Sequence, residues 1–185
     1  KVNLLKNLDY IKDEKLTEKG IFASKIYGYE LSLSELYEKG ILDHLSELEL
    51  GVLSLALVYE PRKGSYRPPL TETAKKLRNA TKDIINHIQY TEKKFGITSL
   101  SKSLFYHLAP CIEAWMKNES FDKILSYTNA DEGEIIRYFR MCIQILREIL
   151  DTSASLTFKE NVKNTIALIN RDIVDAEKQL RAEET

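Results

Sequence analysis

The sequence predicts an all-α protein, built as a bundle of about seven to eight helices. Apolar residues recur at helical spacing over most of the 185 residues. Residues that commonly cap helices precede several of these segments, and glycines follow some of them. No segment alternates apolar and polar residues clearly enough to predict a strand.

Residues 1–27 are expected to be the end of a winged-helix-like unit whose beginning precedes the sequence. A short amphipathic helix is predicted from Val2 to Ile11, followed by a break at Asp13 and Glu14. Thr17 is a good N-cap for the next helix. We therefore divide the chain into this segment and one helical domain over residues 28–185.

The helical domain begins with two well-defined helices. The first is predicted over residues 30–38, before Gly40. Ser46 starts the second, which is apolar on almost every face through Val58 and is expected to be the most buried helix. Residues 61–69 contain three of the four prolines and are predicted to form a loop.

Five further helices are expected after this loop. They are predicted over residues 71–94; 101–117, with a kink at Pro110; 120–127, capped by Ser120; 131–151; and 160–182.

Composition limits the possible functions. The chain has 27 basic and 28 acidic residues, whereas a free-standing nucleic-acid-binding domain usually has a basic excess. Any nucleic-acid contact must therefore come from a local group of side chains. Cys111 and Cys142 have neither the spacing of metal ligands nor a disulfide framework, so we expect two buried thiols in a reducing, cytoplasmic setting. No apolar run is long enough to predict a membrane span.

The sequence shows no set of catalytic residues and no metal site. It lacks a phosphate-binding loop of the G-x-x-x-x-G-K-[ST] type. The pair Asp131 and Glu132 is interpreted as the acidic first turn of a helix, where the helix dipole favours it. The three histidines are far apart in the sequence and have no partner at the spacing of a triad.

The helix over residues 131–151 carries a polar stripe with two interpretations. Arg137 and Arg140 are three residues apart and therefore share a face, together with Gln144 and Arg147. The stripe is either a solvated surface with ion pairs such as Glu134 with Arg137, or a row of guanidinium groups that stack on bases and bind phosphates.

The most specific pattern runs from Trp115 to Arg137, and shorter motifs surround it. A glycine at position 133, early in a helix, suggests that another backbone approaches closely. The upstream motifs are Leu16-Thr17-x-Lys19-Gly20, Glu30-Leu31-x-Leu33-x-Glu35-Leu36 and Leu53-Ser54 through Glu60, and the downstream motif is Arg171-Asp172-Ile173-Val174. The central pattern consists of Trp115, Phe121, Ile124, Thr128, Asn129, Glu132, Gly133, Ile135, Ile136 and Arg137.

Together these motifs resemble the C-terminal helical (DSHCT) domain of superkiller-like, exosome-associated DExH-box RNA helicases. Their order and approximate spacing hold over nearly the whole chain. The sequence departs from the family pattern at Ile21, where Arg is usual, at Asn118, where Gly is usual, and at Phe139, where a basic residue is common.

The resemblance implies an accessory domain that grips single-stranded RNA during 3′–5′ translocation and has no catalytic site of its own. By similarity, residues 131–151 are the ratchet helix and Arg137 is its base-contacting arginine. Glu60 matches a carboxylate that faces the RNA, and we add Arg140 to the candidate RNA-binding residues. ATP and Mg²⁺ would bind RecA-like motor domains in the same polypeptide rather than this chain. The expected partners are single-stranded RNA, with DNA left open, and the RNA-degradation machinery, but no membrane.

Two alternatives remain at this point: a scaffold that braces a motor or docks a partner without touching RNA, and an independent helical enzyme or regulator. Arginines that face a concave basic surface would favour gripping, whereas arginines neutralised by neighbouring carboxylates would favour the scaffold. Among the motif residues, Trp115, Phe121 and Gly133 are expected to serve packing, and Arg171 and Asp172 to form a structural ion pair.

Overall fold

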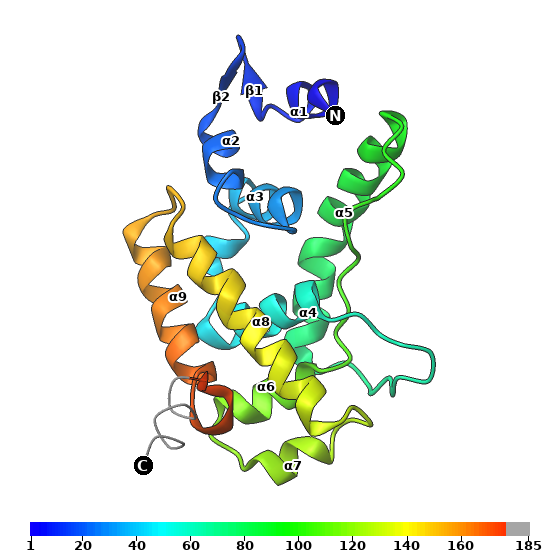
Figure 1. Ribbon diagram of the computed structural model, residues 1–185, viewed down its shortest axis with the longest axis vertical. Helices are drawn as coiled ribbons and strands as arrows, with labels where there is room; N and C mark the ends of the chain where they lie inside the picture. Colours follow the sequence, from blue (N-terminus) through cyan, green and yellow to red (C-terminus); the bar gives the residue numbers. More distant parts are fainter. Residues whose placement is uncertain (177–185) are drawn as a thin grey trace.

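The computed structural model describes residues 1–176, and these form the predicted all-α architecture (Figure 1). The described residues contain nine α-helices, two short 3₁₀ helices and one two-stranded hairpin. The helices are α1 (Val2–Asn7), α2 (Glu18–Ala23), α3 (Glu30–Glu38), α4 (Glu47–Val58), α5 (Glu72–Lys94), α6 (Ala109–Met116), α7 (Phe121–Leu125), α8 (Glu132–Leu150) and α9 (Leu156–Ile169). The 3₁₀ helices are η1 (Leu42–His44) and η2 (Asp172–Val174), and the strands are β1 (Ile11–Lys12) and β2 (Lys15–Leu16).

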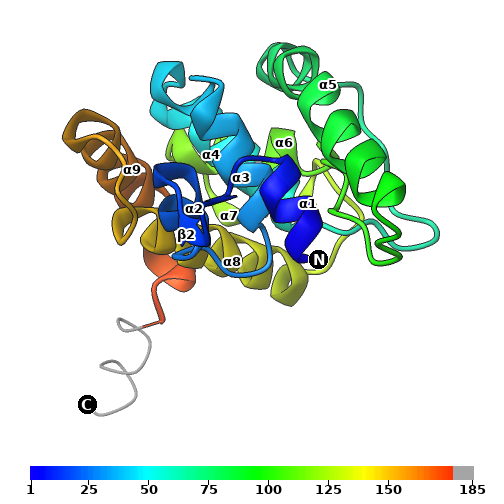
Figure 2. The ribbon, with the colours of Figure 1, turned by 90° about the horizontal axis from the view of Figure 1, so that it is seen from above.

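Helix α4 lies at the centre of the bundle. It packs against α5, α6, α8 and α9, and α5 and α9 lie on opposite sides of it (Figure 2). Every residue from Leu50 to Val58 is buried, as expected for a helix that is apolar on all faces. The side chain of Ser46 accepts from the backbone N–H of Glu49, and the Glu49 carboxylate accepts from the backbone N–H of Ser46. This capping box fixes the start of the helix.

The N-terminal segment contains the hairpin that the sequence did not predict. Strands β1 and β2 pair antiparallel, with Ile11 opposite Leu16. Each strand has two residues, too few for an alternating pattern to be recognised. The predicted first helix is shorter than expected, because α1 ends at Asn7. The predicted cap of the next helix is confirmed, since the Thr17 hydroxyl accepts from the backbone N–H of Gly20 at 3.1 Å.

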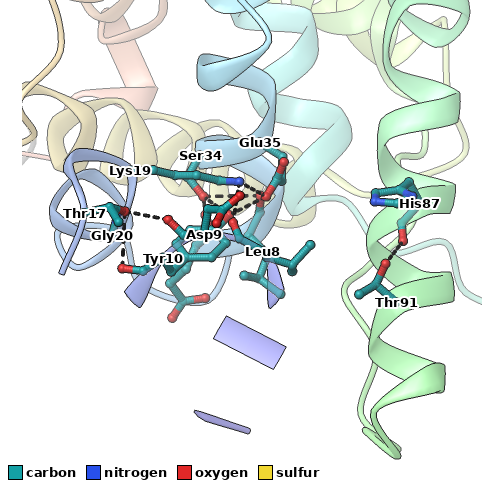
Figure 3. A network of polar contacts seen from close by, with 12 residues as sticks. Leu8, Asp9, Tyr10, Thr17, Lys19, Gly20, Ser34, Glu35, His87 and Thr91 are labelled. Carbon is teal, nitrogen blue, oxygen red and sulfur yellow. Dashed lines mark hydrogen bonds and ion pairs between the residues drawn. The ribbon is translucent and has the colours of Figure 1, made fainter. Parts of the chain in front are cut away.

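A buried polar network joins this segment to α3 (Figure 3). Lys19 and Tyr10 converge on Ser34 and Glu35, which lie in α3. The Lys19 ammonium forms an ion pair with Glu35 and donates to the carbonyl of Leu8 at 2.8 Å. The Tyr10 hydroxyl lies 2.6 Å from the Ser34 hydroxyl and donates to Glu35 at 3.0 Å. The network therefore supplies a partner for each polar group that is buried where the two parts of the chain meet.

The predicted start of the helix that contains Trp115 is wrong, and so is its predicted kink. The helix expected over residues 101–117 begins only at Ala109, and Pro110 lies in its first turn, where the missing N–H costs little, rather than at a kink. Residues 101–106 run as a segment without regular secondary structure that contacts both α5 and α4, and residues 107–108 form a turn. The Gln89 amide donates to the carbonyl of Ser101 at 2.8 Å, and the N–H of Phe105 donates to the carbonyl of Ala56 at 3.0 Å.

The last helix also differs from its prediction. Helix α9 begins earlier than expected because the hydroxyl of Ser155 caps it, accepting from the N–H of Phe158 at 3.2 Å. It ends at Ile169, whose carbonyl accepts from the Trp115 indole N–H at 2.9 Å, and η2 follows. The part of the prediction beyond residue 176 lies outside the described residues.

Candidate functional site

A cleft lies between α8, the segment after α4 and the non-helical segment before α6. It has a volume of about 440 Å³. Two of the predicted RNA-binding residues, Glu60 and Arg137, lie on its wall although they are far apart in the sequence. Its lining consists of Val58, Glu60, Pro61, Arg62, Lys102, Arg137, Tyr138 and Met141.

Tyr138 holds the two sides of this cleft together. Its buried hydroxyl donates to the carbonyl of Glu60 at 3.3 Å and lies 3.4 Å from the N–H of the same residue. Its ring packs edge-on against Tyr59, with ring centroids 5.0 Å apart. The Arg137 guanidinium lies over the Tyr138 ring, 4.3 Å from its centroid, in a cation–π contact. The polar contacts of one tyrosine therefore place Glu60 beside Arg137.

The charges around the cleft are unevenly paired. Glu60 forms an ion pair with Lys102, and this hydrogen bond raises the pKa of the lysine. Arg62 pairs with Glu134 at 2.7 Å, and Glu134 does not form the ion pair with Arg137 that the interpretation of the stripe as a solvated surface includes. Within residues 1–176, no carboxylate forms an ion pair with Arg137, whose guanidinium contacts the Tyr138 ring and the sulfur of Met141. Arg137 therefore presents an exposed positive charge in a concave site.

A second concave surface follows α8 and shares Arg137 and Met141 with the cleft. It has a volume of about 550 Å³ and is mostly apolar, lined by Gly133, Ile136, Arg137, Arg140, Met141 and Gln144. Arg140 lies here, but its guanidinium donates to the carbonyls of Val174 at 2.9 Å and Ile173 at 3.0 Å. Of the two predicted arginines, Arg137 is exposed and Arg140 is half-buried and anchors η2 to α8.

The residues of the family pattern near Trp115 form part of the core. Trp115 is buried, and Phe121 packs edge-on against it with centroids 5.8 Å apart. The Arg171 guanidinium lies 3.4 Å from the centre of the indole ring and donates to the carbonyls of Trp115 at 2.8 Å and Glu119 at 3.0 Å. Arg171 also pairs with Asp172 at 2.6 Å. The predicted packing roles of Trp115 and Phe121 and the predicted ion pair are confirmed.

The motif residues before and within α8 shape the start of this helix. The Thr128 hydroxyl accepts from the N–H of Ala130 at 3.1 Å, and Glu132 is exposed in the first turn of α8. The expected close backbone approach at Gly133 is wrong, as is a packing role for it, since this residue is exposed and a methyl group there would meet nothing nearer than Asp131 Oδ1 at 3.5 Å. Such an approach occurs at Gly20 instead, where a Cβ would lie 2.2 Å from the carbonyl oxygen of Tyr10.

Two departures from the family pattern have a structural explanation. Asn118 adopts a left-handed backbone conformation with φ of 65°, which Gly and Asn tolerate better than other residues. Phe139 is fully buried in the core, so an apolar side chain suits this position, where the family commonly has a basic residue. Ile21 is partly exposed on the surface of α2, and nothing in the structure explains it.

The described residues form no metal-binding group, and their two thiols are buried. Cys111 and Cys142 are free, buried thiols as predicted, and burial raises the pKa of Cys111 to about 12. No group of three or more His, Cys, Asp or Glu side chains in residues 1–176 is arranged to hold a metal ion. In the same range, every helix is too short or too polar to cross a membrane.

Three residues of the cleft were missed in the sequence: Arg62, Lys102 and Tyr138. Arg62 lies two residues after the predicted Glu60 in a basic stretch, which is a signal that could have identified it. Lys102 falls in a segment that was expected to be helical, and only the non-helical course of this segment brings the side chain to Glu60. Tyr138 looks like any core aromatic residue in the helical pattern of α8.

Comparison with known proteins identifies the family. The model of the DSHCT (NUC185) domain matches residues 13–177. The chain is 25% identical over 170 residues to the ATP-dependent RNA helicase mtr4 of Schizosaccharomyces pombe, covering 88% of this chain and 15% of that protein. It is 26% identical over 186 residues to mRNA transport homolog 4 of Caenorhabditis elegans, covering 94% of this chain and 18% of that protein. The chain thus spans less than a fifth of the length of these relatives. Because the family match extends over most of its length, the chain belongs to the DSHCT (NUC185) domain family.

Proposed function

We propose that this chain is the accessory domain of an ATP-dependent RNA helicase and grips single-stranded RNA during 3′–5′ translocation. One observation carries the proposal: Arg137 is exposed at the junction of two concave surfaces, and no carboxylate of the described residues forms an ion pair with it. The similarity to an ATP-dependent RNA helicase supports the same function.

The chemistry of the site suits a sequence-independent grip. A guanidinium group on a rigid helix can stack on any base or bind a phosphate, which is what a moving strand requires. The carboxylate of Glu60 can accept a hydrogen bond from a ribose 2′-hydroxyl, which distinguishes RNA from DNA. Its ion pair with Lys102 reduces the repulsion between this carboxylate and the phosphates. Arg140 would contribute to RNA binding only as part of the wall of the second concave surface, because its guanidinium holds η2 in place.

The proposal includes partners outside this chain. RecA-like motor domains in the same polypeptide would bind ATP and Mg²⁺, and the RNA-degradation machinery would use the unwound strand. A cytoplasmic location is supported by the free thiols of Cys111 and Cys142, which are typical of a reducing compartment.

The test compares Arg137→Ala with Arg147→Ala, which removes an exposed arginine on the same helix outside both concave surfaces. Binding of fluorescein-labelled oligouridine is measured by fluorescence anisotropy at two salt concentrations, and circular dichroism checks the fold. Arg137→Ala is expected to weaken binding roughly tenfold, a value typical of one lost stacking contact. Arg147→Ala is expected to bind nearly as tightly as the wild type. Equal affinities of the wild type and Arg137→Ala would favour the scaffold instead.

A further inference from the structure

The loop between α4 and α5 has a charge that differs from the rest of the chain. It projects from the body beside α5 (Figure 1). Between Glu60 and Glu72 there are three basic residues, Arg62, Lys63 and Arg67, and no acidic one, although the whole chain has a net charge of −1. Tyr66 lies among them with 51% of its surface exposed. Residues 62–67 are called the basic loop below.

The basic loop is held in one conformation by side chains from other elements. The Asn129 carboxamide, just before α8, accepts from the N–H of Tyr66 at 2.7 Å and donates to the carbonyl of Gly64 at 2.9 Å. The Arg67 guanidinium donates to His107 Nε2 at 3.2 Å. Since its conformation is fixed in advance, the basic loop would lose little conformational entropy when a ligand binds.

Local turn geometry exposes the middle of the loop. Gly64 has φ of 87°, a conformation that glycine adopts without strain. The N–H of Arg62 donates to the Ser65 hydroxyl at 2.8 Å, and the N–H of Ser65 donates to the carbonyl of Arg62 at 3.0 Å. One bond to the Ser65 side chain and one between backbone groups thus close the turn, and the side chains of Lys63 and Tyr66 are exposed to solvent.

The basic loop is continuous with the cleft around Arg137. Arg62 belongs to both, because it begins the loop and lines the cleft. Its side chain remains 66% exposed while it pairs with Glu134. A strand that leaves Arg137 along this side of the molecule therefore meets Arg62 first and the rest of the loop next.

The combination of residues distinguishes between two kinds of ligand. The cations alone are sufficient to attract an acidic protein surface, and such a ligand does not require an aromatic ring among them. A single-stranded nucleic acid uses both, because phosphates bind the cations and a base stacks on an exposed aromatic ring. The exposed Tyr66 among three basic residues favours the nucleic acid.

We propose that the basic loop is a second contact for single-stranded RNA, in which Tyr66 stacks on a base and Lys63 binds a phosphate. This inference rests on the proposed function, because the strand reaches the loop from the cleft at Arg137. It extends the interface beyond the helix α8 to a loop that Asn129 positions.

The test measures the affinity of the 185-residue chain for fluorescein-labelled oligouridine. Tyr66→Ala removes the ring, Tyr66→Phe keeps it, and Tyr90→Ala removes an even more exposed tyrosine from α5 as a control. Tyr66→Ala is expected to weaken binding about tenfold, which corresponds to about 1.4 kcal/mol. Tyr66→Phe and Tyr90→Ala are expected to bind like the wild type. Lys63→Ala is expected to lower the slope of log affinity against log salt by about 0.7, the value for one phosphate of a single strand.

The outcomes separate this inference from the proposed function. If Tyr66→Ala and Lys63→Ala bind like the wild type while Arg137→Ala binds more weakly, the basic loop is not an RNA contact and the proposed function stands. If only the loop variants lose affinity, the loop is an RNA contact and the assignment of Arg137 is wrong. If the wild-type chain binds no oligouridine, both proposals fail, and a protein becomes the ligand to seek for the loop.

Discussion

Gly20 and Gly133 both lie in helices, but their surroundings differ. A methyl group at Gly20 would lie 2.2 Å from a backbone oxygen that accepts from Thr17, whereas at Gly133 the nearest atom would be 3.5 Å away. We expect Gly20→Ala to lower the free energy of unfolding by roughly 1–3 kcal/mol or more, because backbone must move. Gly133→Ala should raise it by up to about 1 kcal/mol, because alanine has the higher helix propensity. Urea denaturation of both variants measures these changes.

The two variants serve as controls for each other, since each replaces a helical glycine by alanine. A stabilised Gly20→Ala would show that the Tyr10 carbonyl can move away without cost. A destabilised Gly133→Ala would contradict the open space that the structure shows around this residue.

His107 predicts a dependence of stability on pH. Burial, and next the positive charge of Arg67, lower the pKa of His107 below its ordinary value of about 6.5. The unfolded chain therefore binds a proton at higher pH than the folded chain does. The stabilisation from neutral His107 is complete above about pH 6.5 and is lost as the pH falls toward the folded pKa. An NMR titration of the ring should give a midpoint below 6.5.

The variant His107→Gln isolates this effect, because glutamine does not titrate but can still accept a hydrogen bond from Arg67. Its free energy of unfolding should fall less than that of the wild type between about pH 7 and pH 5. The same decrease in both proteins would assign the pH dependence to other groups.

Single residues also show what the sequence could and could not predict about the site. Arg137 and Glu60 were found through their motifs, and the structure places both on one cleft. The role of Arg140 as an anchor of η2 could not be foreseen, because its partners are carbonyls more than thirty residues away that have no side-chain signature. Tyr138 was missed for a similar reason, since its bonds are to the backbone of Glu60.

At the scale of elements, helix starts were predicted well where a side chain caps the helix. The predicted start residues Thr17 and Ser46 accept from a backbone N–H in the first turn. The side chain of Ser120, the third predicted cap, makes no such bond, so that prediction is wrong. The prediction was wrong where tertiary contacts decide the conformation. Residues 101–106 have a helical pattern, but bonds to α4 and α5 keep them out of a helix. Local propensity is a weak guide where such contacts compete.

The two hydrogen bonds from the Asn129 side chain to the loop between α4 and α5 give a prediction at this scale. Asn129→Ala removes both hydrogen bonds to the loop between α4 and α5. We expect the amide of Tyr66 to exchange with solvent much faster, because it loses its acceptor. The free energy of unfolding should change by only about 1 kcal/mol, since the bonds are exposed. Hydrogen exchange followed by NMR measures the first effect and urea denaturation the second.

Ser126→Ala is the matched control, because this exposed hydroxyl bonds only within its own turn, to the carbonyl of Lys123. It should leave the exchange of the Tyr66 amide unchanged. Unchanged exchange in Asn129→Ala as well would show that the turn bonds between Arg62 and Ser65 are sufficient to hold the loop.

At the scale of the molecule, residues 1–176 form two apolar clusters of very different size. The main core surrounds α4 and extends from Phe22 to Val174. The second consists of Leu4, Leu8, Tyr10 and Ala23, with partly buried neighbours that include Leu31 of α3 and Phe95 after α5. The domain boundary after residue 27, which the sequence suggested, stays a prediction. The small cluster indicates that the N-terminal segment depends on α3 and α5 for its stability.

The ion pair between Lys19 and Glu35 should therefore control how this segment is attached. Both side chains are largely buried, with 12% and 8% of their surfaces exposed. Glu35→Gln keeps the shape but leaves the Lys19 ammonium without its counter-charge, which typically costs about 3–5 kcal/mol. We expect the amides of α1 and α2 to exchange faster by hydrogen–deuterium mass spectrometry, while those of α4 and α8 remain protected.

Two comparisons define the outcome of this experiment. Glu119→Gln, which breaks an exposed ion pair with Lys123, should leave exchange in α1 and α2 unchanged. Replacing both buried charges, in Lys19→Met with Glu35→Leu, should restore much of the lost protection, because no unpaired charge remains. Glu35→Gln could instead accelerate exchange in α4 and α8 as strongly as in α1 and α2. The two clusters would then unfold as one unit. The network around Glu35 would in that case stabilise the whole molecule rather than only the contact between the N-terminal segment and α3.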